Sequence, residues 1–273
     1  MSSRIELNGV GQTFLVRGDD DRRLREFVAL ADLDLEIRAG EFLTLVGPSG
    51  CGKSTVLDLI AGLTRPTSGS LTVDGRAITG PGLDRSVVFQ QYTLLPWRNA
   101  RANIEFALEA KGGLGKAERA ERARTYLELV GLGDFANRYP HELSGGMKQR
   151  VAIARSLSYQ PEVLLMDEPF GALDAQTRER LQGELLSIWQ RTGTTVLFIT
   201  HDIDEAVFLG QRVAVMSGRP GQIKEVIDIG LDRTTAADED LRATPAFAEY
   251  RHRVWSLLRE PRTTAREAVA HVA

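Results

Sequence analysis

Features that mark secreted or membrane-spanning chains are scarce in this sequence. It has a single cysteine among its 273 residues, which excludes an internal disulfide. No apolar run approaches the roughly 20 residues that a membrane-spanning helix requires. The opening stretch, MSSRIELNGV, lacks the apolar core of a secretory signal. We therefore expect the chain to stay in the cytoplasm.

An excess of basic charge is also missing. Lysine and arginine total 34 against 37 aspartate and glutamate residues, which gives a net charge of −3 and an isoelectric point near 5.9. Nucleic-acid-binding domains usually carry a basic footprint, so this balance argues against a nucleic-acid partner. With 42% hydrophobic residues, the chain can bury a substantial core, either as one large domain or as a domain with a subdomain.

Glycine is present where a phosphate-binding turn needs it. The stretch GPSGCGKST, residues 47–55, lies between the strand-like run EFLTLV and the helix-like run VLDLIAGL. A glycine-rich turn of this kind points successive backbone N–H groups inward at a helix N-terminus, where an anion binds. The spacing matches the P-loop pattern, whose lysine reaches the terminal phosphates and whose hydroxyl binds Mg²⁺. The residues predicted to hold the nucleotide are Gly47, Pro48, Ser49, Gly50, Cys51, Gly52, Lys53, Ser54 and Thr55.

A pair of carboxylates follows a second apolar run, VLLM. Asp167 and Glu168 are predicted at the carboxyl end of this strand, the edge of an open α/β sheet where ligands bind. Asp167 suits a Mg²⁺ ligand, and Glu168 suits a base that positions water for attack on a γ-phosphate. Taken alone, the pair is equally compatible with an acidic cap on the following helix. The P-loop upstream favours the first interpretation, and favours hydrolysis over transfer to a second substrate.

The stretch ELSGGMKQR has the character of a second phosphate-binding helix start. Ser144, Gly145 and Gly146 offer a hydroxyl and bare backbone amides before an apolar helical run. With these residues the sequence resembles the ATP-binding subunits of ABC transporters, in which LSGGMKQR is the family signature. The resemblance covers almost all of residues 1–230. It implies that two chains pair head to tail, each ATP with its Mg²⁺ lying between the P-loop of one chain and residues 144–146 of the other.

The resemblance assigns further residues one at a time. Gln90 matches the glutamine loop that senses the Mg²⁺ and water, with Gln91 adjacent to it as the alternative. Asp174, in GALDA, matches the D-loop at the dimer interface, and His201 matches the switch histidine that contacts the γ-phosphate. Phe14 matches the aromatic residue that stacks on adenine. The expected catalytic residues are thus Glu168, His201 and Gln90, and the expected Mg²⁺ ligands are Ser54, Gln90 and Asp167.

The P-loop cysteine carries an expectation of its own. A thiol near a helix N-terminus tends toward a lowered pKa and higher reactivity. We therefore expect Cys51 to be the site through which alkylating reagents inactivate the protein, and we expect ATP to protect it.

The order of strand-like and helix-like segments predicts an α/β fold. We expect a P-loop NTPase core with a mainly parallel sheet and an N-terminal antiparallel β subdomain, at about 1–92 and 161–230. A helical subdomain is expected as an insert at about 93–160, and a helical tail at about 231–273. The segment 17–26 is a charged insert predicted as a solvated loop, and VDGR at 73–76 is predicted as a tight turn leading to RSVV. The tail has an apolar stripe predicted to dock on its own domain, comprising Phe247, Tyr250, Val254, Trp255 and Leu258.

A finer resemblance follows Gln90. The stretch FQQYTLLPWRNARANIEFAL is similar to the nitrate, sulfonate and taurine import ATPases. This implies a pair of ATPase subunits, expected to be identical, at the cytoplasmic face of the membrane beneath permease subunits, with a solute-binding protein as an indirect partner. Trp97 and Arg98 fit packing within the helical subdomain and contact with a partner equally well. An ABC-type ATPase of an exporter or of DNA repair is the alternative, although a repair ATPase normally carries long coiled coils, which this sequence lacks.

Overall fold

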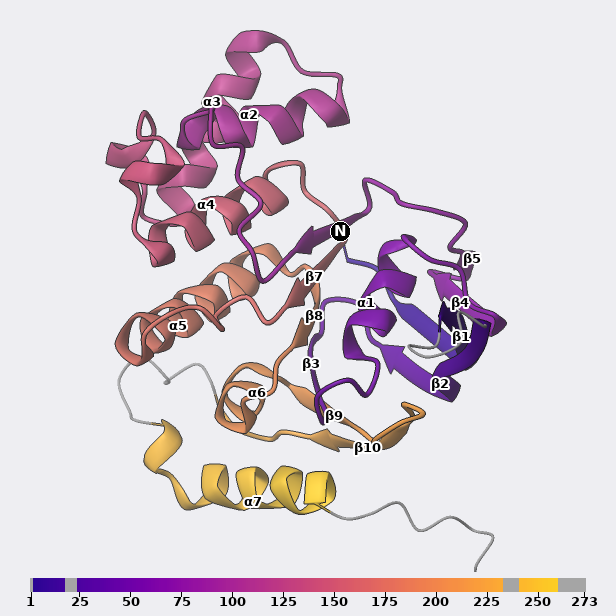
Figure 1. Cartoon of the computed structure of the whole chain (residues 1–273). Helices are drawn as coiled ribbons and strands as arrows, with labels where there is room; N and C mark the ends of the chain where they lie inside the picture. The colour runs from indigo at the N-terminus through magenta and orange to yellow at the C-terminus, as the bar shows by residue number, and fades with distance from the viewer. Residues whose placement is uncertain (1, 18–23, 233–240, 260–273) are drawn as a thin grey trace, which may run out of the picture.

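The computed structural model describes residues 2–17, 24–232 and 241–259, and within these ranges ten strands form two sheets (Figure 1). The larger sheet has the order β10-β9-β3-β8-β7-β6 and the smaller the order β2-β1-β4-β5. The strands are β1 Ile5–Arg17, β2 Leu24–Ile37, β3 Phe42–Val46, β4 Ser68–Val73, β5 Arg76–Ala77, β6 Arg85–Val88, β7 Val163–Asp167, β8 Thr195–Ile199, β9 Arg212–Met216 and β10 Ile223–Asp228.

Helices connect the parallel strands and cover them. The helices are α1 Lys53–Ala61, α2 Ala100–Lys111, α3 Lys116–Leu129, α4 Gly145–Ser158, α5 Ala175–Thr192, α6 Ile203–Leu209 and α7 Pro245–Arg259. Short 3-10 turns lie at Gly133–Phe135, Pro140–Glu142 and Leu241–Ala243. Most of the predicted charged insert, residues 18–23, and part of the predicted tail lie outside the described residues.

The six-stranded sheet is buried on both faces. Phe42 and Val46 of β3 belong to the core that packs against helices α4 to α7, whereas Leu43 and Leu45 face α1 and the four-stranded sheet. The strands β6, β7, β8, β3 and β9 run parallel, and only β10 is antiparallel to its neighbour. Burial of both faces explains why the parallel strands consist of nearly continuous apolar runs. The predicted mainly parallel core and antiparallel N-terminal sheet are confirmed.

Helices α2, α3 and α4 pack on one another beyond one edge of the larger sheet (Figure 1). Asn103, fully buried in α2, donates to the backbone carbonyl groups of Leu95, Arg98 and Asn99 at 2.9 to 3.2 Å and so fixes the segment LLPWRN. Trp97 in this segment is 71% exposed, so its side chain does not pack within the helices. The division of the chain into core, helical subdomain and tail stays a prediction.

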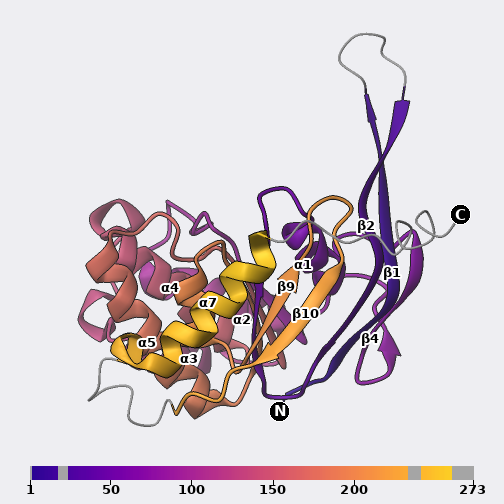
Figure 2. The ribbon, with the colours of Figure 1, turned by 90° about the horizontal axis from the view of Figure 1, so that it is seen from below.

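The smaller sheet differs from the prediction in one connection. The turn VDGR joins β4 to β5 and does not lead directly to RSVV. RSVV forms β6, which belongs to the larger sheet. Strand β10 was not predicted; it pairs with β9 at the sheet edge. The β1–β2 hairpin extends beyond the rest of its sheet, as Figure 2 shows.

The tail helix α7 packs on α6 and β9. Phe247 and Val254 are buried as expected, with Tyr250 and Leu258 partly buried against the same core. Trp255 does not belong to the buried stripe: its side chain stacks on His252 and the residue is 43% exposed. The prediction for Trp255 is therefore wrong, because its indole packs on side chains of its own helix, His252 and Arg259, and not in the core.

Candidate active site

A curled loop joins β3 to α1. Gly52 has φ of 103°, and a Cβ there would lie 2.6 Å from the Leu30 side chain, so only glycine fits. A Cβ on Gly47 would lie 2.7 Å from the sulfur of Cys51. No side chain caps α1, so the N–H groups of its first turn stay available for an anion. The predicted P-loop therefore has the backbone of a phosphate cradle.

Lys53 is the first residue of α1 and is buried. Its ammonium group donates to the carbonyl oxygens of Gly47, at 2.9 Å, and Pro48, at 3.1 Å. These bonds hold the positive charge inside the loop, where the terminal phosphates of a nucleotide would lie. Gly47 and Pro48 thus contribute through their carbonyl groups to the placement of Lys53.

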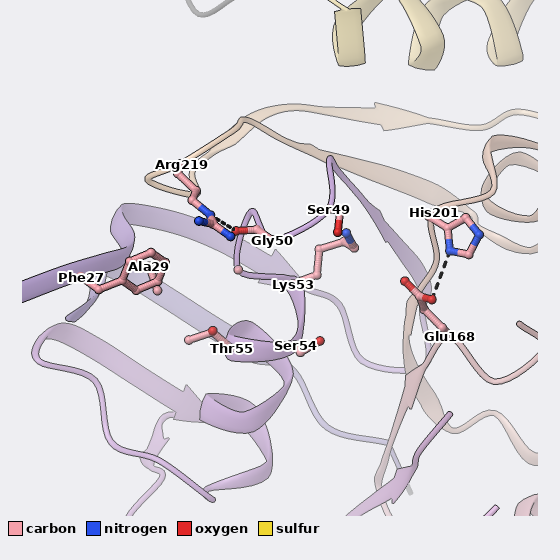
Figure 3. Close-up of a pocket in the computed structure, with 11 residues that line it drawn as sticks. Phe27, Ala29, Ser49, Gly50, Lys53, Ser54, Thr55, Glu168, His201 and Arg219 are labelled. Atoms are coloured by element: carbon pink, nitrogen blue, oxygen red, sulfur yellow. Dashed lines mark hydrogen bonds and ion pairs between the residues drawn. The ribbon is translucent and has the colours of Figure 1, made fainter. Parts of the chain in front are cut away.

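A cavity of about 530 Å³ opens beside this loop (Figure 3). Its walls come from β2, from the P-loop and α1, from the ends of β7 and β8, and from the turn between β9 and β10. The lining residues are Phe27, Ala29, Ser49, Gly50, Gly52, Lys53, Ser54, Thr55, Glu168, His201 and Arg219. The fold thus brings most of the predicted P-loop residues together with Glu168 and His201, which lie more than a hundred positions later in the sequence.

The acidic residues lie at the carboxyl end of β7. The Asp167 carboxyl group accepts a hydrogen bond from the Ser54 hydroxyl. Burial raises the pKa of the Asp167 carboxyl, and the neighbouring Glu168 charge raises this pKa further. A carboxylate and a hydroxyl held side by side are oxygen ligands of the kind that Mg²⁺ prefers. Within the described ranges no group of three or more His, Cys, Asp or Glu side chains forms a metal site. Asp167 and Ser54 are the side chains at this strand end that would hold a Mg²⁺ ion.

Glu168 and His201 lie side by side at one end of the cavity (Figure 3). The Nδ1 atom of His201 lies 3.1 Å from Oε2 of Glu168, and the two side chains are 67% and 25% exposed (Figure 3). Glu168 has φ of 43°, a value that is uncommon outside glycine. Backbone strain of this kind clusters at functional sites. The pair offers a carboxylate base and an imidazole at the open side of the cavity.

Gln90 does not line the cavity. A Cβ on Gly171 would lie 3.4 Å from the amide nitrogen of Gln90, so the amide lies against the turn that follows Glu168. The loop after Gln90 is tied to α4, because Arg155 donates to the carbonyl oxygen of Thr93 at 2.7 Å and to its hydroxyl at 2.9 Å. Gln90 is thus placed between the acidic turn and the helical part of the molecule.

The predicted signature residues do not reach the cavity of their own chain. Ser144 caps α4 by accepting a hydrogen bond from the N–H of Met147 at 3.3 Å, and Gly145 and Gly146 open the helix. Asp174 caps α5 and accepts from the N–H of Thr177 at 2.9 Å, and this bond lowers the pKa of the Asp174 carboxyl. None of these residues lines the cavity. The prediction that they complete the site of a second chain remains a prediction.

Phe14 and Cys51 also lie outside the lining of the cavity. Phe14 is not among the lining residues, whereas Phe27, its directly opposite partner on β2, is. Cys51 is 1% exposed, its side chain packs in the core, and burial raises the pKa of its thiol. The expectation of a lowered pKa at Cys51 is therefore wrong, because desolvation outweighs the helix N-terminus and Lys53.

Some lining residues were missed in the sequence. Phe27 and Ala29 alternate along β2, and this spacing alone places them on one face of the strand. Arg219 has no sequence signal, because its partner Gly50 lies 169 positions away and only the fold brings them together.

None of the helices in residues 2–17, 24–232 and 241–259 is long and apolar enough to cross a membrane.

Comparison with known proteins agrees with this geometry. Residues 30–171 match the family described as ABC transporter. The chain is 53% identical over 247 residues to the nitrate import ATP-binding protein NrtD of Synechocystis sp., covering 89% of this chain and 92% of the relative. It is 46% identical over 271 residues to the nitrate import ATP-binding protein NrtC of Synechococcus elongatus, covering 97% of this chain but 40% of that longer relative.

Solved structures show the same fold. The dimeric ATP-binding cassette MJ0796, in a post-hydrolysis state bound to ADP and phosphate, matches with a TM-score of 0.71 and 34% identity. The match covers 84% of this chain and 100% of that chain. Sequence, fold and cavity agree, and together they establish that this chain belongs to the ABC transporter family as an ATP-hydrolysing, ATP-binding subunit.

Proposed function

We propose that this ATPase subunit energises the uptake of a small anion such as nitrate through a membrane permease. The printed names of its relatives NrtD and NrtC support this proposal, since both are nitrate import proteins. The subunit works at the cytoplasmic face of the membrane, beneath permease subunits to which a solute-binding protein delivers the anion. The solute never enters the ATP cavity, so no residue of that cavity selects it.

The proposal that this cavity binds ATP is supported by one observation above all: Lys53, Glu168 and His201 line the same cavity. We propose that the Lys53 ammonium, now bonded to two loop carbonyls, donates to the terminal phosphates of ATP. Asp167 and Ser54 would hold a Mg²⁺ ion, with Gln90 as a further expected ligand, and the ion would offset the charge of the phosphates.

The chemical step needs a base for water. The Glu168 carboxylate accepts a proton as water attacks the γ-phosphorus, and the bond to the β–γ bridging oxygen breaks to give ADP and phosphate. His201 contacts the γ-phosphate and holds the Glu168 carboxylate in position through the 3.1 Å contact. Each of these roles belongs to a side chain at the end of a strand or at a helix start, where the backbone is fixed.

The site is completed by a second copy of the chain. Residues 144–146 lie at a helix N-terminus that no residue of the cavity covers, and Asp174 lies exposed at the start of α5. We propose that these groups face the nucleotide of a partner chain, as two cassettes pair head to tail. The dimeric state of the similar cassette MJ0796 supports this arrangement.

Reconstitution tests the transport proposal. The chain is co-expressed with the permease and solute-binding protein of neighbouring reading frames, placed in vesicles, and supplied with ATP and nitrate. We expect ATP-dependent nitrate accumulation, which a Lys53→Ala chain does not support. ATP hydrolysis that no permease stimulates, with no nitrate uptake, would contradict the importer proposal while leaving the ATPase assignment intact.

A further inference from the structure

Arg242 connects the tail of the chain to the core beside the ATP cavity. It lies in the 3-10 turn Leu241–Ala243 that precedes α7, and its guanidinium carbon lies 4.2 Å from the centroid of the Phe208 ring of α6. Its Nη2 atom donates to the side-chain oxygen of Gln182, in α5. Gln182 is 1% exposed, so Arg242 reaches from the tail into the interior of the protein.

A chain of buried hydrogen bonds continues from Gln182. The side-chain nitrogen of Gln182 donates to Oε1 of Glu205 at 2.9 Å, and the Thr200 hydroxyl donates to Oε2 of the same carboxyl at 2.6 Å. The Thr200 oxygen accepts in turn from the backbone N–H of Asp202 at 3.0 Å. Gln182, Thr200 and Glu205 are each at most 6% exposed, so water does not readily replace a bond that this network loses.

The Glu205 carboxyl determines the direction of these bonds. Burial raises the pKa of this carboxyl, and the hydrogen bonds from Thr200 and Gln182 oppose the rise, as does Arg178, whose Nε lies 3.9 Å from Oε1. Since both carboxyl oxygens accept, Gln182 presents its NH2 group to Glu205 and its oxygen to Arg242. The amide of Gln182 is therefore held between a cation and a carboxylate.

His201 lies between the two residues that share the Thr200 hydroxyl. Thr200 supplies the oxygen and Asp202 supplies the N–H, so this bond closes a tight backbone turn around His201. The His201 side chain is 67% exposed and has little packing of its own to hold it. The direction of its imidazole toward Glu168, 3.1 Å away, therefore depends on the backbone turn (Figure 3).

We propose that Arg242 is a positioning residue for ATP hydrolysis, which acts through Gln182 and Glu205 on the turn that carries His201. This inference rests on the proposed function, in which His201 contacts the γ-phosphate. Without Arg242, the Gln182 oxygen is a buried acceptor with no partner. The amide then turns to find a donor, Glu205 loses a hydrogen bond, and the turn at His201 loosens. Hydrolysis thus depends on the contact of the tail with α5 and α6.

Steady-state ATPase kinetics and calorimetric titration with Mg-ADP test this role on the full chain. Arg242→Ala should lower kcat by about tenfold, because a misplaced His201 slows the chemical step, and should leave KM and the Mg-ADP affinity unchanged. One Mg-ADP bound per chain shows that the variant is folded. Arg242→Lys keeps a charged donor for Gln182 and should recover most of the lost rate. The matched control is Arg253→Ala, which removes a tail arginine that pairs with Glu225 and should keep the wild-type kcat.

A double-mutant cycle tests the route of the effect. Gln182→Met removes the amide between Arg242 and Glu205, so adding Arg242→Ala to it should lower kcat no further than Gln182→Met does alone. Losses that add in the double variant would mean that the two residues act independently, which overturns the proposal. A loss of kcat in Arg242→Ala that matches a loss of Mg-ADP binding sites would mean a folding defect and would overturn it as well.

His201→Ala separates this inference from the proposed function. We expect it to lower kcat more than Arg242→Ala does. If His201→Ala loses activity while Arg242→Ala keeps the wild-type kcat, the link to the tail is overturned and the role of His201 stands. If His201→Ala hydrolyses ATP at the wild-type rate, the proposed role of His201 fails and the inference fails with it. Should Arg242→Ala not fold, a wild-type kcat in Gln182→Met would overturn the proposal, and a lowered kcat with unchanged Mg-ADP binding would support it.

Discussion

Replacing Lys53 with alanine removes the one ammonium group that the P-loop encloses. Its bonds to the carbonyl oxygens of Gly47 and Pro48 are lost. Gly47 is buried, so its unpaired carbonyl costs roughly 1–3 kcal/mol, whereas Pro48 is exposed and its carbonyl can bond water instead. Removal of a buried charge offsets part of this cost. We therefore expect the free energy of unfolding of the ligand-free protein to fall by only about 1–2 kcal/mol, which lowers Tm by roughly 2–6 °C in a chain of this size.

The effect on nucleotide binding is larger. A charge-assisted contact to phosphate is worth about 1.5–3 kcal/mol, so ATP affinity should fall by about 10- to 150-fold. No other lysine lines the cavity to replace Lys53. ATP hydrolysis should collapse, because the same contact stabilises the charge that moves onto the phosphates during the reaction.

Thermal unfolding with and without Mg-ATP, together with a phosphate-release assay, measures both effects. Lys116→Ala is the matched control, since Lys116 is also the first residue of a helix but is exposed and far from the cavity. A Lys53→Ala protein that melts normally, keeps the stabilisation by ATP and hydrolyses ATP near the wild-type rate would refute the reasoning.

Other predictions follow from particular contacts. Asp167→Asn should stop hydrolysis yet stabilise the ligand-free protein near neutral pH, because burial raises the folded-state pKa of this carboxyl and disfavours its charged form. The gain should shrink as the pH falls through the raised pKa toward about 4; urea unfolding that shows a constant gain would contradict this. Cys51 should react slowly with iodoacetamide in the native protein, with or without ATP, and fast labelling would contradict its burial. Arg155→Ala should lower the free energy of unfolding by about 2 kcal/mol through its lost bonds to Thr93. Adding Thr93→Gly should recover about 1 kcal/mol, since Thr93 has φ of 48°, and further destabilisation in urea would count against this.

The sequence predicted the features whose physical cause is local. The P-loop lies between a strand and a helix, and its glycines have the conformations that such a turn requires. The parallel strands were found because burial on both faces makes them continuously apolar. The acidic turn at Asp167 was predicted because a strand end fixes its position in the sheet.

Features that depend on distant contacts were missed or mistaken. The pKa of Cys51 was predicted in the wrong direction, because its neighbours in sequence indicate a helix terminus. Its side chain instead packs in the core, where removal from water raises the pKa. Arg219 was missed because its partners come from the P-loop and from β2, and no periodicity along the chain brings these segments together. The choice between Phe14 and Phe27 depends on the register of β1 and β2, which the sequence alone does not fix.

The two-chain ATP site is tested most directly by the size of the protein in solution. Glu168→Gln keeps the shape of the side chain but loses the base, which typically contributes about 10²–10⁴ in rate, so an ATP-bound pair should accumulate. Ser144→Arg places a bulky cation at the start of α4, on the surface proposed to face the partner's nucleotide, and thermal unfolding checks that this variant folds despite the lost cap.

Size-exclusion chromatography with light scattering on Glu168→Gln, alone and combined with Ser144→Arg, measures this pairing with and without ATP. We predict that Glu168→Gln is a monomer without nucleotide and a dimer with ATP, and that the double variant stays a monomer in both conditions. An ATP-induced dimer that persists unchanged in the double variant would contradict the proposed contact between residues 144–146 and the partner's nucleotide.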